Sequence, residues 1–74
     1  MKINGSKVDT SRVKFSSKTV TCDPIQYEST ATAVINGKTF TGDYCGDIEE
    51  SRAECKQGAY ISLRANCQRA GISI

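Results

Sequence analysis

Hydrophobic and polar positions alternate along three stretches of the chain, a pattern typical of half-buried β-strands because successive side chains point to opposite faces. In the first stretch, Val13 and Phe15, and later Val20 and Cys22, stand among polar residues. The next two stretches are rich in Thr, Val, Phe and Tyr, which fit a pleated surface well. We therefore expect strands over residues 12–22, 29–35 and 38–44.

Two Asn-Gly pairs predict tight turns, because a type I′ hairpin turn needs positive φ at both central residues. Asn36-Gly37 predicts that the second and third strands form a hairpin, and Asn4-Gly5 predicts a turn near the start of the chain. Asp23-Pro24 ends the first strand, since proline has no N–H for a ladder. Residues 23–27 are therefore predicted to connect the first strand to the hairpin.

A long helix is predicted after the third strand. Asp47 is the expected N-cap, and Glu50 three residues later has the spacing of a capping box. Gly71 is suited to the left-handed conformation that follows many helix ends. The helix is therefore expected to span residues 48–70.

One face of this helix is apolar and must cover the sheet. Its stripe contains Ile48, Cys55, Ala59, Leu63 and Ala70, with Cys67 at the margin. Gly58 costs about 1 kcal/mol in a helix interior relative to alanine, which indicates a close approach to a strand or a slight break. The expected architecture is α+β, a three-stranded antiparallel sheet packed against one long C-terminal helix.

Size and composition disfavour an enzyme. The chain has 74 residues, and we expect a single small α+β domain over residues 1–74. Such a core has little room for the several hundred cubic ångströms, roughly, of a small-molecule site. The chain also contains no histidine, the commonest general acid and base. We expect no catalytic residues and no cofactor.

Charge and hydropathy exclude fewer classes of binding partner. The net charge is +2, from ten basic and eight acidic residues, which permits contact with nucleic acid without requiring it. No apolar run is long enough to span a membrane, and the first five residues lack the apolar core of a signal peptide. We expect no membrane partner, and either a cytosolic chain or a mature form whose signal was removed.

Four cysteines leave the redox state open: Cys22, Cys45, Cys55 and Cys67. An even number in a short chain is compatible with two disulfides and equally with reduced thiols buried as small hydrophobic residues. Their spacing contains no Cys-x-x-Cys pair, so a zinc site built from all four thiolates is the least favoured alternative and no metal is predicted. Disulfides would indicate secretion, whereas reduced thiols would indicate a cytosolic or viral origin.

Charged residues gather around the predicted helix start. Four of them are carboxylates, at Asp43, Asp47, Glu49 and Glu50. We expect helix capping from them, because carboxylates are favourable at a helix start. A calcium site is less favoured, because the spacing of an EF-hand is absent.

Arg52 and Lys56 lie four residues apart, where like charges repel, in the half of a helix that disfavours cations. Either a function requires positive charge there, or nearby glutamates neutralise a solvated face.

Two segments resemble the C-terminal two-thirds of a double-stranded-RNA-binding domain: Ala33-Val-Ile-Asn-Gly-Lys-Thr-Phe-Thr-Gly and Ser51-Arg-Ala-Glu-Cys-Lys-Gln-Gly-Ala-Tyr. The second is similar to that family's Ser-Lys-Lys-x-Ala-Lys helix start, which places lysines on phosphates across the RNA major groove. The resemblance implies this role for Arg52 and Lys56, with Lys38 as an additional backbone contact. Ala53 stands where the family has its second lysine.

Two functions follow as hypotheses. The first is a small interaction or inhibitor protein, of the phage-encoded or secreted effector type, that binds another protein through exposed sheet edges and through an outward-facing Tyr60 and Ile61. The alternative is a double-stranded-RNA-binding module that uses Lys38, Arg52 and Lys56. A monomer or a weak homodimer formed by sheet extension is expected.

Overall fold

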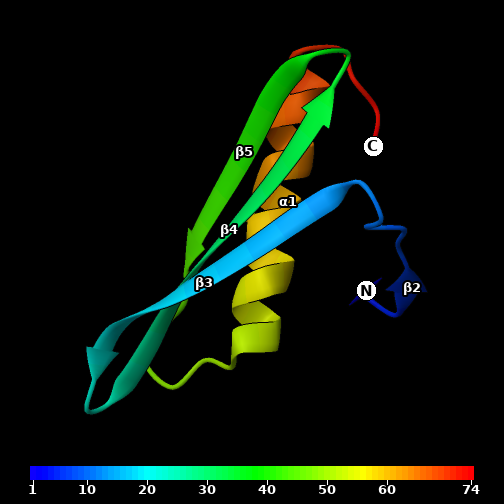
Figure 1. The fold of residues 1–74 in the computed structure, drawn as a ribbon. Helices are drawn as coiled ribbons and strands as arrows, with labels where there is room; N and C mark the ends of the chain where they lie inside the picture. The colour runs from blue at the N-terminus through cyan, green and yellow to red at the C-terminus, as the bar shows by residue number, and fades with distance from the viewer.

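The computed structural model describes residues 1–74 and shows an α+β fold with a three-stranded antiparallel sheet packed against one helix (Figure 1). The sheet contains β3 (Val13–Cys22), β4 (Ile25–Ile35) and β5 (Lys38–Cys45), in the spatial order β3-β4-β5. The helix α1 (Arg52–Arg69) crosses one face of it. A small hairpin, β1 (Lys2–Ile3) and β2 (Ser6–Lys7), precedes the sheet. The predicted fold class is confirmed.

Both Asn-Gly turns form as predicted. Asn4 and Gly5 have φ values of 51° and 80°, and Asn36 and Gly37 have 52° and 79°, so each pair supplies the two positive φ angles of a type I′ turn. The predicted connection over residues 23–27 is wrong, because β4 begins at Ile25 and only Asp23-Pro24 separates it from β3. The tight turn lets the β3–β4 ladder continue to its very end.

The β3–β4 hairpin is longer than the helix that supports it. Its ladder runs from Val13 opposite Ala33 to Cys22 opposite Ile25, with an irregularity between Thr19 and Thr21. An 18-residue helix is about 27 Å long, whereas the molecule extends over 41 Å. The tip of the hairpin therefore projects beyond α1, at the lower left of Figure 1.

The helix begins later than predicted, with Ser51 as its N-cap rather than Asp47. The Ser51 hydroxyl accepts a hydrogen bond of 3.2 Å from the Glu54 N–H. Asp47 and Glu50 instead form a separate turn, in which the Glu50 N–H donates to the Asp47 carbonyl and the Asp47 N–H donates to the Glu50 carboxylate. Glu49 has a φ of 67°, which stops this turn from continuing into the helix.

The helix ends at Arg69, one residue earlier than predicted, and Gly71 follows the cap with a φ of 75°. Its N–H donates to the Gln68 carbonyl, and the Ile72 N–H donates to the Cys67 carbonyl. These two bonds form a Schellman motif, which confirms Gly71 as the C′ residue.

Small residues form the centre of the interface between helix and sheet. The buried cluster contains Ala31, Ala33, Ala59, Leu63 and Cys67. Gly42 and Gly58 extend the close approach, since a Cβ at Gly42 would meet the backbone of α1 and one at Gly58 would meet the Tyr44 ring. The predicted close approach at Gly58 is therefore confirmed.

The predicted stripe is right in its middle and wrong at its ends. Cys55 is also fully buried on the inner side of α1. Ile48 lies outside the helix and is 59% exposed, and Ala70 is an exposed cap residue.

The single helix, α1, does not have the length and apolar character of a membrane-spanning helix.

Candidate partner-binding edge

The two faces of the sheet have different side chains. Alternate residues of β4, including Ser29, Ala31 and Ala33, are buried beneath α1. The opposite face, here termed the open face, is polar except for Val34 and Cys45. In strand order it contains Lys14, Ser16 and Lys18; Glu28, Thr30, Thr32 and Val34; and Thr39, Thr41, Asp43 and Cys45.

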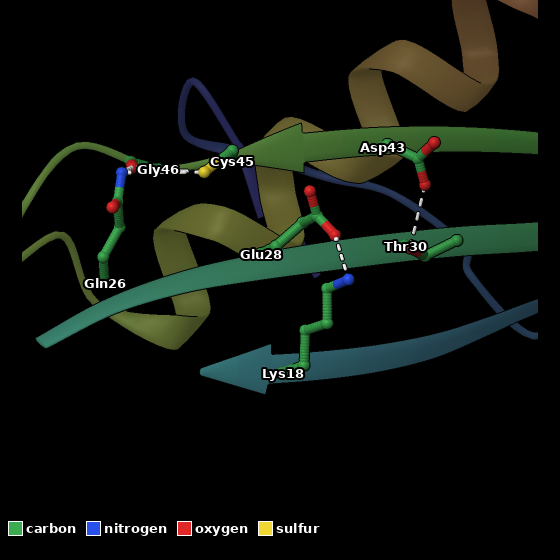
Figure 2. Close-up of polar contacts among 7 residues, drawn as sticks. All are labelled: Lys18, Gln26, Glu28, Thr30, Asp43, Cys45 and Gly46. Atoms are coloured by element: carbon green, nitrogen blue, oxygen red, sulfur yellow. Dashed lines mark hydrogen bonds and ion pairs between the residues drawn. The ribbon is translucent and has the colours of Figure 1, made fainter. Parts of the chain in front are cut away.

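Figure 2 shows the polar contacts on this open face. The Thr30 hydroxyl donates to Asp43 at 2.8 Å, which joins β4 to β5. The Lys18 ammonium lies 3.1 Å from the Glu28 carboxylate, which joins β3 to β4 and is the one ion pair in the structure. Lys14 lies on the same face of β3, four residues before Lys18. It has no carboxylate partner.

The backbone of β3 presents an unpaired edge. The Val13 N–H donates to the Thr10 carbonyl, which places it on the side away from β4. Because hydrogen-bonding direction alternates along an antiparallel strand, the N–H and C=O groups of Phe15, Ser17 and Thr19 also point away from β4. No backbone hydrogen bond outside the ladder involves residues 14–22. These six outward groups are the free edge of the sheet.

The other edge of the sheet, along β5, is partly closed by the helix. The Asn66 side-chain amide donates a hydrogen bond of 2.6 Å to the Thr41 carbonyl, which points outward from β5. The helix packs mainly on β4 and β5 and hardly touches β3. From Ser16 onward every residue of β3 is exposed. The edge of β3 is therefore the better site for an incoming strand.

Lys56 covers the helix side of this edge. Its ammonium lies 4.6 Å from the centre of the Phe15 ring, and the Arg52 guanidinium lies 4.8 Å from the centre of the Tyr27 ring. Both distances are within the range of cation–π contacts. The two cations are thus held against aromatic rings of the sheet while their residues remain exposed.

The three residues predicted to bind nucleic acid are not brought onto one surface. Lys38 follows the Asn36-Gly37 turn at the start of β5, whereas Arg52 begins α1 after β5 has ended. The helix runs back along the sheet, so its first turn lies at the end of the sheet away from Lys38 (Figure 1). Only Arg52 and Lys56 are neighbours.

The predicted outward-facing pair is half right. Ile61 is 43% exposed, but Tyr60 is fully buried, so the prediction that Tyr60 faces outward is wrong. Tyr60 lies on the side of α1 that also carries Ala53, Lys56 and Gln57. The last three line a hollow together with Met1, Lys2 and Thr10. The N-terminal segment thus lies next to this side of α1.

The four cysteines are all free, so the disulfides considered for Cys22, Cys45, Cys55 and Cys67 do not form. Cys55 and Cys67 are about 18 Å apart along one helix, far beyond the reach of a disulfide. Cys45 lies on the open face and Cys22 near the hairpin tip. Burial raises the pKa of the Cys55 and Cys67 thiols. These buried thiols are packing residues.

Among the carboxylates just before the helix, that of Glu50 has structural partners. Glu50 accepts hydrogen bonds from the Tyr44 hydroxyl at 3.1 and 3.2 Å, and this contact is the main cause of the raised pKa of Tyr44. No group of three or more cysteine, aspartate or glutamate side chains is arranged to hold a metal ion. The expected capping role is wrong, because Ser51 is the N-cap and Glu50 instead fixes the loop.

Comparisons with protein-family models, with curated proteins and with solved structures found no match. The candidate site therefore depends on geometry alone. The sequence predicts exposed sheet edges but does not single out the backbone of Phe15, Ser17 and Thr19, because the order of the strands decides which edge is free. The run of polar residues through β3 was the signal that could have found it.

Proposed function

We propose that this chain is a non-enzymatic protein-binding module, of the interaction or inhibitor type, and that an extended segment of its partner adds to the sheet along β3. The observation that carries this proposal is the edge itself. Nine of the ten residues of β3 pair with β4, none pairs on the other side, and most of the strand is exposed. Strand addition of this kind uses main-chain hydrogen bonds for affinity and side-chain contacts for selectivity.

Hydrogen bonds alone are not enough for tight binding. The outward groups of Phe15, Ser17 and Thr19 accept or donate six bonds to an antiparallel strand, worth roughly 3–9 kcal/mol at about 0.5–1.5 kcal/mol each. Association costs roughly 4–15 kcal/mol in lost freedom. Selective binding therefore requires side-chain contacts on the two faces of the added strand, and a partner without them is rejected.

The double-stranded-RNA alternative stays a prediction with less support. Arg52 and Lys56 are neighbours at the helix start, as that alternative needs, but their cations lie over the Tyr27 and Phe15 rings. Lys38 is at the far end of the sheet, and the loop before the helix contains the carboxylates of Asp47, Glu49 and Glu50. An anionic duplex at this position would face negative charge beside the two cations.

A peptide selection tests the proposed function. A displayed library of unstructured peptides is selected against the whole chain, and the winners are titrated into isotopically labelled protein while amide shifts are followed by NMR. We expect the largest shifts at Phe15, Ser17 and Thr19. A set of winners that shifts the outer face of α1 around Ile61, or no winners at all, would overturn the proposal.

Ser17 provides the matched control. Ser17→Pro removes an outward N–H without breaking the ladder to β4, and Ser17→Ala loses the same hydroxyl contact with Ser29 but keeps the N–H. We expect the proline variant to lose binding and the alanine variant to retain it. Equal binding by the two variants would show that the peptides do not pair with this edge.

A further inference from the structure

We infer that the segment that adds to β3 is acidic, with carboxylates opposite Lys14 and Lys18 and an apolar side chain opposite Phe15. This inference rests on the proposed function and specifies the partner. It follows from the charges around the free edge, from the cost of pairing two copies of β3, and from the alternation of an antiparallel strand.

Cations flank the edge on both of its faces. Lys14 and Lys18 project on the open face, and Lys56 lies over Phe15 on the helix face. Glu28 pairs with Lys18 alone, so Lys14 is left without a partner. Lys14 and Arg12, together with Thr32 and Val34, line the largest hollow of the surface, of about 540 Å³.

Asp9 and Asp23 flank β3 in the sequence and Glu28 pairs with Lys18, but the other carboxylates lie farther from the edge. Asp43 is on β5, two strands and therefore about 10 Å from β3, and it accepts a hydrogen bond from Thr30. Asp47, Glu49 and Glu50 are in the loop that follows β5. The only charged residues of β3 itself are Lys14 and Lys18, so the free edge favours an anionic strand over a neutral one.

A second copy of the chain is a poor occupant. The outward groups of Phe15, Ser17 and Thr19 must pair with the same groups of the other copy. One register then places Lys14 opposite Lys18 and another places Lys18 opposite itself, with like charges directly across the strands. The remaining register places Ser17 opposite Ser17. It brings Lys14 and Lys18 of both copies close together on the shared open face. Lysines on an edge oppose self-pairing in this way.

The alternation of the added strand fixes the positions of its side chains. In an antiparallel strand, six consecutive residues lie opposite Thr19, Lys18, Ser17, Ser16, Phe15 and Lys14. The second and sixth residues then share the open face with the two lysines, so we expect glutamate or aspartate there. The fifth residue shares the helix face with Phe15 and Lys56, so we expect an apolar residue there.

The test uses a ten-residue probe, Ser-Gly-Thr-Glu-Thr-Thr-Val-Glu-Gly-Ser, titrated into the labelled full chain. Its matched control replaces both glutamates by glutamine. We expect shifts at Phe15, Ser17 and Thr19 with the acidic probe, and binding about five- to twenty-fold weaker with the glutamine probe, from a few-fold per opposite-charge pair. Equal binding of both probes at β3 overturns the acidic assignment while the proposed function stands. Silence of both probes at millimolar concentration, with no library winner at β3, overturns both.

A charge reversal tests the register. Lys14→Glu should weaken the acidic probe at least ten-fold, and a probe with lysine at the sixth core position should recover most of that loss. Lys38→Glu changes the net charge equally but lies on β5, so we expect it to change the affinity less than two-fold. If the two variants lost affinity equally, the effect would come from net charge alone, and the proposed register would be wrong.

Two other occupants are outcomes of the same experiment. Concentration-dependent shifts at β3 without any probe, with a matching rise in sedimentation coefficient, would make a second copy the occupant and overturn the inference. Shifts at Lys14 and Lys18 with a double-stranded RNA of about 16 base pairs, in the range one such domain covers, would assign these cations to phosphates and overturn it as well.

Discussion

Replacing Gly42 by alanine tests the packing that leaves β3 free. A Cβ built at Gly42 lies 2.6 Å from the Leu63 Cα and 2.7 Å from the Ala59 carbonyl oxygen. Carbon atoms in contact prefer about 3.5–4.0 Å, so α1 would have to move by roughly 1 Å. Both neighbours are backbone atoms of a helix, and they cannot rotate away as the end of a side chain does.

The expected magnitude follows from two opposing terms. Glycine in a strand costs about 0.5–1 kcal/mol relative to alanine, so an unobstructed Gly42→Ala change would stabilise the fold by that amount. Overpacking typically costs about 1–3 kcal/mol, and displacement of α1 also loosens the contacts of Leu63. We expect a net loss of roughly 1–3 kcal/mol, a large share of the roughly 4–11 kcal/mol expected for a chain of this size.

Urea unfolding followed by circular dichroism measures this change, with the slope against urea expected to stay constant. Gly58→Ala is the comparison, because its Cβ meets the Tyr44 side-chain ring and alanine gains about 1 kcal/mol in a helix. We expect Gly58→Ala to cost less than Gly42→Ala. A stabilising Gly42→Ala variant would refute the close backbone approach of α1 to β5.

Three further predictions concern the buried groups. Ellman's reagent should modify the exposed Cys22 and Cys45 rapidly in the native protein, and Cys55 and Cys67 only after unfolding. Because burial raises the pKa of Cys55 and Cys67, the unfolded chain loses its thiol protons first as the pH rises. The free energy of unfolding should therefore be constant with respect to these thiols below about pH 8.5 and fall above it, by at most about 1.4 kcal/mol per pH unit per thiol, in urea titrations at several pH values. Tyr60→Phe removes a buried hydroxyl that has no hydrogen-bond partner, so thermal unfolding should show no loss of stability and a gain of up to about 1 kcal/mol.

Local signals predicted most of the fold. The Asn36-Gly37 turn fixed the β4–β5 register, and Gly71 marked the helix end, because each needs a positive φ that only a few residues adopt easily. The helix start was misplaced because Asp47 and Ser51 have the same capping chemistry, each with a glutamate three residues later. Glu50 accepts a hydrogen bond from Tyr44 on β5, a tertiary contact that leaves Ser51 rather than Asp47 as the N-cap.

The candidate site was harder to predict, because it depends on arrangement in space. Tyr60 was expected outside since one helical stripe already covered the sheet, and nothing local indicated that the N-terminal segment would approach that side of α1. The alternation in β3 predicted a strand but not its free edge. That edge follows from the order β3-β4-β5 and from the capture of the Thr41 carbonyl by Asn66.

Amide hydrogen exchange along β3 tests the free edge most directly. In the free protein, the amides of Lys14, Ser16 and Lys18 donate to β4 and should exchange slowly, whereas those of Phe15, Ser17 and Thr19 point away from β4 and should exchange rapidly. This alternation is the result expected for an edge open to a partner strand. Slow exchange at all six amides would show that the edge is already covered and would contradict the assignment of β3 as the binding site.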